Sequence, residues 1–268
     1  MMIGQSVQNH RDEVSERGEP TAPPLMHVED LRVRYRNGAI GVHGISFDVF
    51  PGSVVALFGP NGAGKTTTLR AVSGFVRSEG SRVVNGEVVL AGHNVTNSPP
   101  HKMARRGVSL VSERRKIFPN MTVHDNLRAM KTRVPKRRQI ELTEQIDDMF
   151  PTLLSRRQLA AGRLSGGQQQ MLALARGILS DPKLLLIDEL TMGLHHSLHE
   201  SLFDAVRRIS NAGTAVVVVD ESAGLALQMA DYCYLMANGR VVQSGPRSLF
   251  EDQAMVAGGY VDGREAEQ

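Results

Sequence analysis

One glycine-rich segment restricts the folds open to this chain more than any other feature of the sequence. Residues 59–66 are GPNGAGKT, which fits the pattern G-x-x-x-x-G-K-[ST]. An apolar run at 54–58 directly precedes the segment, and a stretch with helical character follows it at 67–73. A buried strand, a tight glycine loop and a helix in this order predict a phosphate-binding loop in an α/β fold. A glycine-rich turn with a chance lysine is the alternative, and the flanking strand and helix argue against it.

The residue types of this segment suit contact with a phosphate chain. Glycines allow successive backbone N–H groups to turn towards an anion, and the start of a helix adds the positive end of its dipole. Lys65 supplies a point charge for the β- and γ-phosphates, and the Thr66 hydroxyl is the expected ligand of Mg²⁺, which prefers oxygen. The predicted nucleotide-binding residues of the segment are Gly59, Pro60, Asn61, Gly62, Ala63, Gly64, Lys65, Thr66 and Thr67.

A second apolar run ends in two carboxylates. Residues 184–189 are LLLIDE, a predicted buried strand followed by Asp188 and Glu189. We expect Asp188 to lie on the metal side, and Glu189 to be the general base that polarises the attacking water without ligating the metal. An ordinary strand end with solvated acids is the alternative.

The pattern of apolar residues predicts a central sheet that is mainly parallel. Continuous apolar runs favour strands covered on both faces, and four such runs lie at 54–58, 108–111, 184–187 and 215–219. Together with the phosphate-binding loop, they predict the α/β class.

Three other patterns add to this sheet. Alternating residues at 31–35 and 45–49 predict an antiparallel β layer. Residues 232–236 and 240–243 predict a late hairpin, joined by residues 237–239. Apolar residues at helical spacing between 123 and 180, with breaks at Pro135 and Pro151, predict a helical subdomain inserted between strands of the sheet.

Composition excludes several classes of protein. The 268 residues suffice for one large α/β domain, and the single cysteine, Cys233, cannot form an internal disulfide or a thiolate metal site. The net charge of +3 is too small to indicate a nucleic-acid-binding protein by itself. No apolar run approaches the length of a membrane span, and residues 1–24 lack the apolar core of a signal peptide.

A third motif lies between the first two. Residues 164–168 are LSGGQ, and they open the apolar stretch 171–179. Ser165 and the backbone N–H groups of Gly166 and Gly167, at a predicted helix start, form a second anion cradle. In this order and context, the three motifs resemble those of ABC-type ATPases, and the resemblance runs from about residue 26 to residue 245.

The resemblance implies a P-loop NTPase core of the ABC ATPase type, which binds ATP and Mg²⁺ and hydrolyses ATP. In this family the cradle of one protomer grips the γ-phosphate bound to the opposite protomer, so two nucleotides are buried in a head-to-tail dimer. The residues implied for that contact are Ser165, Gly166, Gly167 and Gln168. Tyr35 stands where the family stacks an aromatic ring on adenine, and a tyrosine that packs on the core is the alternative.

The resemblance and the polar composition of the two ends together set the expected domain organisation. A disordered N-terminal extension covers residues 1–24, and an ABC ATPase domain covers 25–258. Its helical subdomain lies at about 115–180, and a flexible tail follows at 259–268.

Within the family, residues 107–127 are most similar to ATP-binding subunits of branched-chain amino acid importers, which have urea and short-amide relatives. This resemblance implies import powered from the cytoplasmic face of the cell membrane, where the chain is attached to two transmembrane permease subunits. A second ABC ATPase subunit, the same chain or a different one, and an extracytoplasmic solute-binding protein complete the expected complex. Nucleic acid is not expected as a partner.

Four positions depart from the pattern of most ABC ATPases. Glu113 replaces the glutamine that senses Mg²⁺ and the attacking water, and its carboxylate can still meet a metal-bound water. Glu221 stands at the histidine switch, where a carboxylate repels phosphate unless it is protonated, paired or turned away. Leu190 replaces a proline and His195 an aspartate, so the hydrolysis rate stays open. The implied catalytic residues are Glu189, Glu113 and Glu221, and the implied metal ligands are Thr66, Asp188 and Glu113.

Two clusters and the function as a whole have alternative interpretations. Residues 102–138 hold twelve Lys or Arg and only two acids, which fits a solvated face or contact with lipid headgroups or acidic loops of membrane subunits. Phe118 is the only aromatic there, too few for nucleic acid. His195, His196 and His199 have metal-ligand spacing, but a solvated helix start is the simpler interpretation. The alternative functions are a soluble ABC ATPase acting on ribosomes or DNA, and a weakly hydrolysing regulatory subunit.

Overall fold

The computed structural model describes residues 23–112, 117–130, 134–191, 194–195, 198–221 and 223–251. Its strands are β1 (Met26–Arg34), β2 (Ile40–Val49), β3 (Val54–Phe58), β4 (Arg82–Leu90), β5 (His93–Asn94), β6 (Val108–Val111), β7 (Leu184–Asp188), β8 (Ala215–Asp220), β9 (Tyr232–Ala237) and β10 (Arg240–Pro246). Its helices are α2 (Lys65–Ser73), η2 (Phe75–Glu79), α3 (Pro100–Arg105), α4 (Val123–Arg128), α5 (Lys136–Met149), α6 (Pro151–Leu154), η3 (Ala161–Arg163), α7 (Gly166–Leu179), α8 (His199–Asn211) and α9 (Ala223–Met229).

A six-stranded sheet carries the centre of the fold, with the strand order β10-β9-β3-β8-β7-β6. All neighbouring pairs are parallel except β10 with β9, which confirms the mainly parallel sheet. Both faces are covered, as the continuous apolar runs predicted. Along β8, Val217 and Val219 pack into the core that contains α2, while Val216 and Val218 pack into the core that contains α7 and α8.

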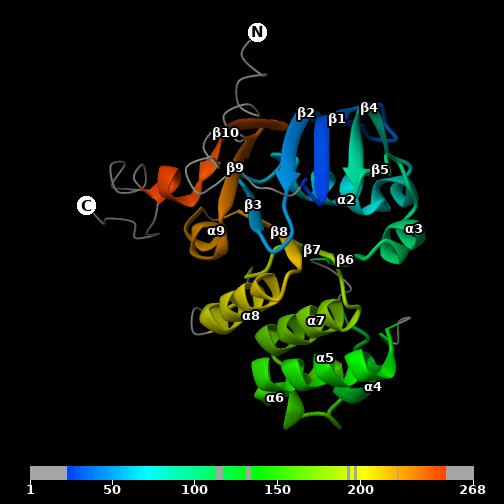
Figure 1. Cartoon of the computed structure of the whole chain (residues 1–268), viewed down its shortest axis with the longest axis vertical. Helices are drawn as coiled ribbons and strands as arrows, with labels where there is room; N and C mark the ends of the chain where they lie inside the picture. The colour runs from blue at the N-terminus through cyan, green and yellow to red at the C-terminus, as the bar shows by residue number, and fades with distance from the viewer. Residues whose placement is uncertain are drawn as a thin grey trace.

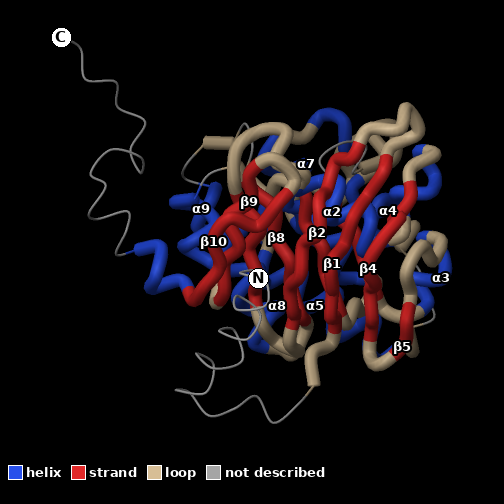
Figure 2. The backbone as a smooth tube through the Cα atoms, turned by 90° about the horizontal axis from the view of Figure 1, so that it is seen from above, coloured by secondary structure: helices blue, strands red, loops and turns tan. Residues whose placement is uncertain are grey.

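The predicted antiparallel β layer is confirmed as a four-stranded sheet in the order β2-β1-β4-β5, and Figure 2 shows these strands side by side. Strand β4 lies outside the patterns identified in the sequence. It pairs with β1 along its length, with a register shift near Asn85 and Gly86. A Cβ at Gly86 would lie 2.2 Å from the carbonyl oxygen of Glu29, so only glycine allows the two backbones to approach this closely.

Helices separate the two sheets and extend the molecule on one side. Helix α2 contacts both sheets, and α7 packs beneath the parallel sheet with α5 and α6 beyond it (Figure 1). Helix α5 begins directly after Pro135, and α6 begins at Pro151, as the predicted breaks require. The inserted helical region is therefore confirmed between β6 and β7.

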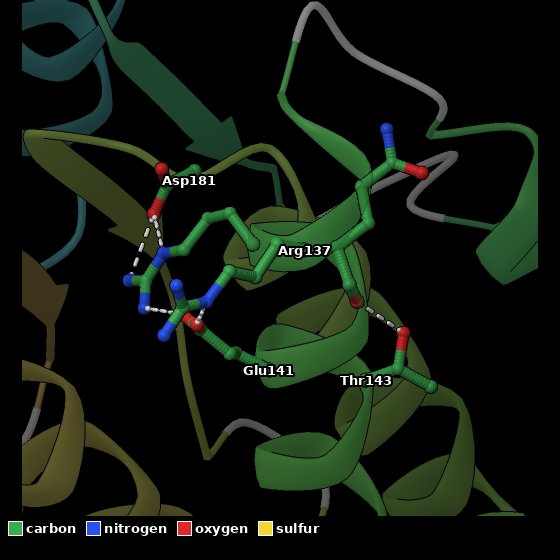
Figure 3. Close-up of polar contacts among 6 residues, drawn as sticks. Arg137, Glu141, Thr143 and Asp181 are labelled. Carbon is green, nitrogen blue, oxygen red and sulfur yellow. Dashed lines mark hydrogen bonds and ion pairs between the residues drawn. The ribbon is translucent and has the colours of Figure 1, made fainter.

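Ion pairs join α5 to the rest of the molecule at both of its ends. Near the first turn, Arg138 donates to Asp181 Oδ1 at 3.1 and 3.0 Å, and Figure 3 shows Asp181 facing α5 across this contact. Near the last turn, Asp148 forms an ion pair with Arg208 of α8. Asp181 directly precedes β7 and Arg208 lies in α8, so these pairs link the helical region to the part of the fold that contains the parallel sheet.

Several sequence-based boundaries shift in the structure. The late hairpin is present, but its turn is the two residues Asn238 and Gly239, both at positive φ, because Ala237 still belongs to β9. Helix α2 begins at Lys65, two residues before the predicted start. Residues 1–22 and 252–268, and with them most of the predicted extension and tail, lie outside the described residues. Among the residues that the structure describes, no helix is long and apolar enough to cross a membrane.

Candidate functional site

The glycine-rich loop turns sharply between β3 and α2. Gly59, Gly62 and Gly64 have φ values of 144°, 78° and 97°, a conformation that side chains with a Cβ rarely adopt. A Cβ at Gly59 would lie 2.1 Å from the carbonyl oxygen of Met236 in β9. The glycines of the motif are therefore required by the backbone of the loop itself.

Lys65 lies inside this loop and is 5% exposed. Its Nζ donates to the carbonyl oxygens of Gly59 at 2.7 Å and Pro60 at 3.0 Å, so the ammonium group spans the loop. Burial lowers the pKa of Lys65, and the nearby carboxylates oppose that shift. Those carboxylates belong to Glu221, Glu189, Asp220 and Asp188, at the ends of β7 and β8.

The loop and the acidic strand end meet through one hydrogen bond. The Thr66 hydroxyl donates to Asp188 Oδ1 at 3.0 Å, although 122 residues separate them in the chain. A hydroxyl and a carboxylate at this distance are the hard oxygen ligands that Mg²⁺ takes while it keeps several waters. The donor set therefore fits Mg²⁺. Within the described residues, no group of three or more His, Cys, Asp or Glu side chains could hold a metal ion on its own.

Glu189 follows β7 in a left-handed conformation, with φ 57°. This conformation costs an ordinary residue about 1 kcal/mol or more, so the surroundings must hold it. The Glu189 N–H donates to Val219 O at 2.9 Å, and Gln170 Nε2 donates to Glu189 O at 3.4 Å. The next residue, Leu190, is fully buried among the apolar side chains that include α7 and α8. The leucine that replaces a proline at this position is thus an anchor in the core.

The end of β8 contributes two further acids. Asp220 is buried, and Glu221 is exposed directly after it. Glu221 exerts the largest of the carboxylate effects that favour the charged form of Lys65. Its charge therefore acts on the Lys65 ammonium inside the loop.

Tyr35 lies beside the loop and outside the core. Strand β1 ends at Arg34, so Tyr35 belongs to the turn that follows, and its side chain is 37% exposed. The Tyr35 hydroxyl shares a hydrogen bond of 2.5 Å with Thr67 Oγ1, and the ring covers Gly41, where a Cβ would lie 2.4 Å from it. An exposed ring next to the loop favours the adenine-stacking hypothesis over a core tyrosine.

The LSGGQ segment starts helix α7. Ser165 is its N-cap, and a reciprocal capping box joins the Ser165 and Gln168 side chains and backbones. Ser165 and Gly166 are exposed, whereas Gly167 is buried and a Cβ there would meet Leu198 at 2.1 Å. Helices α7 and α2 pack into different apolar cores and lie in different parts of the molecule (Figure 1).

The predicted histidine cluster and Glu113 are not placed in this site by the structure. His195 is exposed, whereas His199 begins helix α8 and is buried, so His199 is not part of a solvated helix start. Glu113 and His196 lie outside the described residues, so the roles predicted for them stay predictions.

Comparison with known proteins decides the family. Residues 42–192, more than half of the chain, match the family described as ABC transporter. The chain belongs to this ABC transporter family. The ATP-binding subunits of the family are ATPases, and this chain is one of them.

Relatives of this ABC subunit include ATP-binding proteins of transport systems. One relative is the high-affinity branched-chain amino acid transport ATP-binding protein BraG of Pseudomonas aeruginosa, to which this chain is 32% identical. The similarity covers 83% of this chain and 93% of BraG. The chain is 35% identical, over 87% of its length, to the spermidine/putrescine import ATP-binding protein PotA of Acidothermus cellulolyticus, but spans only 60% of that protein.

Solved structures confirm the fold. A nucleotide-free ATP-binding cassette from an ABC transporter is similar with a TM-score of 0.74, at 23% identity over 91% of this chain and all of that one. A bacterial ABC transporter cassette determined as a dimer has a TM-score of 0.71, at 19% identity over 83% of this chain and 98% of that one. The predicted ABC ATPase architecture is therefore confirmed.

The structure also shows residues near the site that the sequence patterns did not identify. Gln170, Thr191 and Asp220 are buried polar residues whose side chains contact the segments carrying Glu189 and Glu221. The only signal for them in the sequence is a polar residue beside an apolar run, which is common at strand ends.

Proposed function

We propose that this ABC ATPase powers an importer for branched-chain amino acids or related small polar solutes. The similarity to BraG supports this solute class, because it extends over nearly the whole length of both chains. PotA, described as a spermidine/putrescine import ATP-binding protein, is similar over a smaller share of its own length. The motor function of the chain is independent of this choice of solute.

The hydrogen bond between Thr66 and Asp188 carries the proposal for the catalytic site. It joins the phosphate-binding loop to the acidic strand end, so a nucleotide held by the loop would lie against Asp188 and Glu189. We assign Thr66 and Asp188, with Glu113, to the coordination of Mg²⁺. When bound, Mg²⁺ neutralises charge on the phosphate oxygens.

The remaining side chains have separate roles in the same proposal. Lys65 binds the phosphates from inside the loop, and Tyr35 stacks on the adenine ring. Glu189 accepts a hydrogen bond from the attacking water and withdraws its proton. The exposed Glu221 carboxylate directly follows β8, and the positive charge of Lys65 offsets part of its repulsion of phosphate.

The LSGGQ cradle supports assembly with a second ATPase subunit. Ser165 and Gly166 are exposed at the start of α7, away from the chain's own loop. A helix start of this kind binds anions, so it suits the γ-phosphate of a nucleotide on another subunit. The similar cassette determined as a dimer also supports this arrangement.

A groove on the side of the molecule suits a cytoplasmic segment of a permease. It has a volume of about 830 Å³ and lies between α3, β6 and the start of α5. Exposed Phe75 and half-buried Met130 make part of it apolar, while Arg105, Arg106 and Lys183 make it basic. The structure gives these three cations no ion pair within its described part, so an acidic, partly apolar segment of a permease is the proposed occupant.

Substitution of Glu189 tests the proposed chemistry. In Glu189→Gln, ATP affinity should stay within about threefold of wild type, while the rate of phosphate release falls by about 100-fold or more, since general base catalysis is lost. Lys65→Ala, in contrast, should weaken ATP binding at least about tenfold, because the point charge for the phosphates is removed. Both quantities are measured on the purified full chain with its partner subunits. Wild-type turnover in Glu189→Gln would remove Glu189 from the proposed role.

A further inference from the structure

A buried hydrogen bond connects the two acidic segments behind the catalytic carboxylates. The Thr191 hydroxyl donates to Asp220 Oδ2 at 3.0 Å, and the two residues are 4% and 6% exposed. Thr191 follows β7, and Asp220 is the last residue of β8, so the bond joins the ends of two neighbouring strands. Neither residue is among those assigned to nucleotide, metal or water above.

The bond lies where the backbone needs support. Glu189 has the left-handed φ of 57°, and two residues later the chain is tied to β8 by Thr191. Between them, Leu190 is fixed in the core, and before them the Glu189 N–H is bonded to Val219 O. The segment 189–191 is therefore held to β8 at both ends, by a backbone bond at Glu189 and a side-chain bond at Thr191.

The same bond also affects the second acid, the exposed Glu221. Glu221 directly follows Asp220, and Glu189 precedes Thr191 by two residues, so the backbones that carry both acids move together while the bond is intact. Loss of the hydroxyl would leave a buried carboxylate without this donor, which favours movement of the strand end towards water.

We propose that Thr191 and Asp220 are positioning residues for ATP hydrolysis. Their hydrogen bond keeps the backbone of Glu189 in its left-handed conformation and fixes the distance between the two acidic strand ends. The inference rests on the role given to Glu189 under the proposed function. It predicts a contribution to turnover and none to the binding of ATP.

Thr191→Val tests the inference, because valine keeps the shape of threonine and removes the hydroxyl. Thr191→Ser restores the donor, and Thr191→Ala removes it without the added methyl group. The matched control is Thr214→Val, which removes the bond from Thr214 Oγ1 to Pro182 O (3.1 Å) just before the opposite ends of β7 and β8. This control also loses a threonine hydrogen bond, here between the segments that lead into β7 and β8, away from the site.

Two kinds of measurement separate positioning from general stability. On the purified complex, kcat and the Kd for ATP are measured for each variant. On the nucleotide-free chain, amide hydrogen exchange is followed in the peptide that contains Glu189. We expect Thr191→Val and Thr191→Ala to lower kcat about tenfold or more at unchanged Kd, since small misplacement of a catalytic group has effects of this size. They should also speed exchange at Glu189, whereas Thr191→Ser and Thr214→Val stay near wild type.

Each other outcome has a separate meaning. Equal kcat and equal exchange in Thr191→Val and Thr214→Val would overturn the positioning role. A parallel loss of ATP affinity in Thr191→Val would also overturn it, because the effect would then lie in binding. Full turnover in Glu189→Gln would instead refute the role of Glu189 on which the inference rests, so the two failures are distinguishable.

Discussion

Gly59→Ala is the substitution whose effect follows most closely from the structure. Gly59 has φ 144°, and a Cβ there lies 2.1 Å from Met236 O and 3.1 Å from Met236 C. These atoms are backbone, so no change of rotamer relieves the overlap. Gly62, in the same loop, has φ 78° but open space around the position of its Cβ. Gly62→Ala is therefore a control that carries the conformational cost alone.

The two costs can be worked out separately. A side chain at positive φ costs about 1–2 kcal/mol of unfolding free energy, and this is the whole expected effect of Gly62→Ala. Gly59→Ala adds an overlap with fixed backbone. Adding a methyl group to a well-packed protein interior lowers the unfolding free energy by about 1–3 kcal/mol, so we expect a further loss of this size. At about 2–4 °C per kcal/mol for a domain of this size, the Tm should fall by about 4 °C in Gly62→Ala and by about 10 °C in Gly59→Ala.

Thermal unfolding of the nucleotide-free full chain, followed by circular dichroism, measures this difference. The reasoning is refuted if the two variants lose the same Tm, or if Gly62→Ala is the less stable. Either result would mean that the loop does not lie against Met236 as the structure has it.

Two further predictions concern other parts of the fold. Burial raises the pKa of the Cys233 thiol to about 12, so its neutral form adds stability that is complete below the unfolded value of 9.0 and is lost as the pH rises towards 12. Iodoacetamide at pH 8.5 should accordingly label Cys233 only after denaturation by urea, and labelling of the native chain at the unfolded rate would contradict its burial. The Arg138 and Asp181 side chains are 38% and 36% exposed, so a double-mutant cycle with Arg138→Met and Asp181→Asn should give a coupling of about 0.5–1 kcal/mol by urea unfolding. A coupling above about 2 kcal/mol would show that solvent screens this pair far less than the structure implies.

The sequence predicts the parts of this protein that depend on neighbouring residues. The phosphate-binding loop and the Asp188–Glu189 strand end are contiguous motifs, and each lies at the predicted end of a buried strand. The Asn238–Gly239 turn is likewise local, although the exact strand end at Ala237 depends on pairing with β10. The residue types of these short segments were sufficient to predict all three features.

Features that depend on distant contacts were not predictable in the same way. The Asn85–Gly86 pair usually favours a hairpin turn, but here it lies inside β4 beside a register shift, because pairing with β1 outweighs the local preference. The bond between Thr191 and Asp220 joins residues 29 positions apart, and only the neighbouring positions of β7 and β8 bring them together. No local pattern marks either residue.

The central claim, that this ATPase drives a membrane importer, is tested most directly by identifying the chains bound to it. The measurement is affinity purification of the full chain from detergent-solubilised membranes of its own cells, followed by sequencing of the proteins that co-purify. Two double variants are purified in the same way. Arg105→Glu with Arg106→Glu reverses charge in the basic groove, and Arg32→Glu with Arg82→Glu on the antiparallel sheet is the matched control. The account predicts two polytopic permeases and a second ATPase subunit, with the permeases lost only in the groove variant. Ribosomal, DNA-bound or purely soluble partners would contradict it.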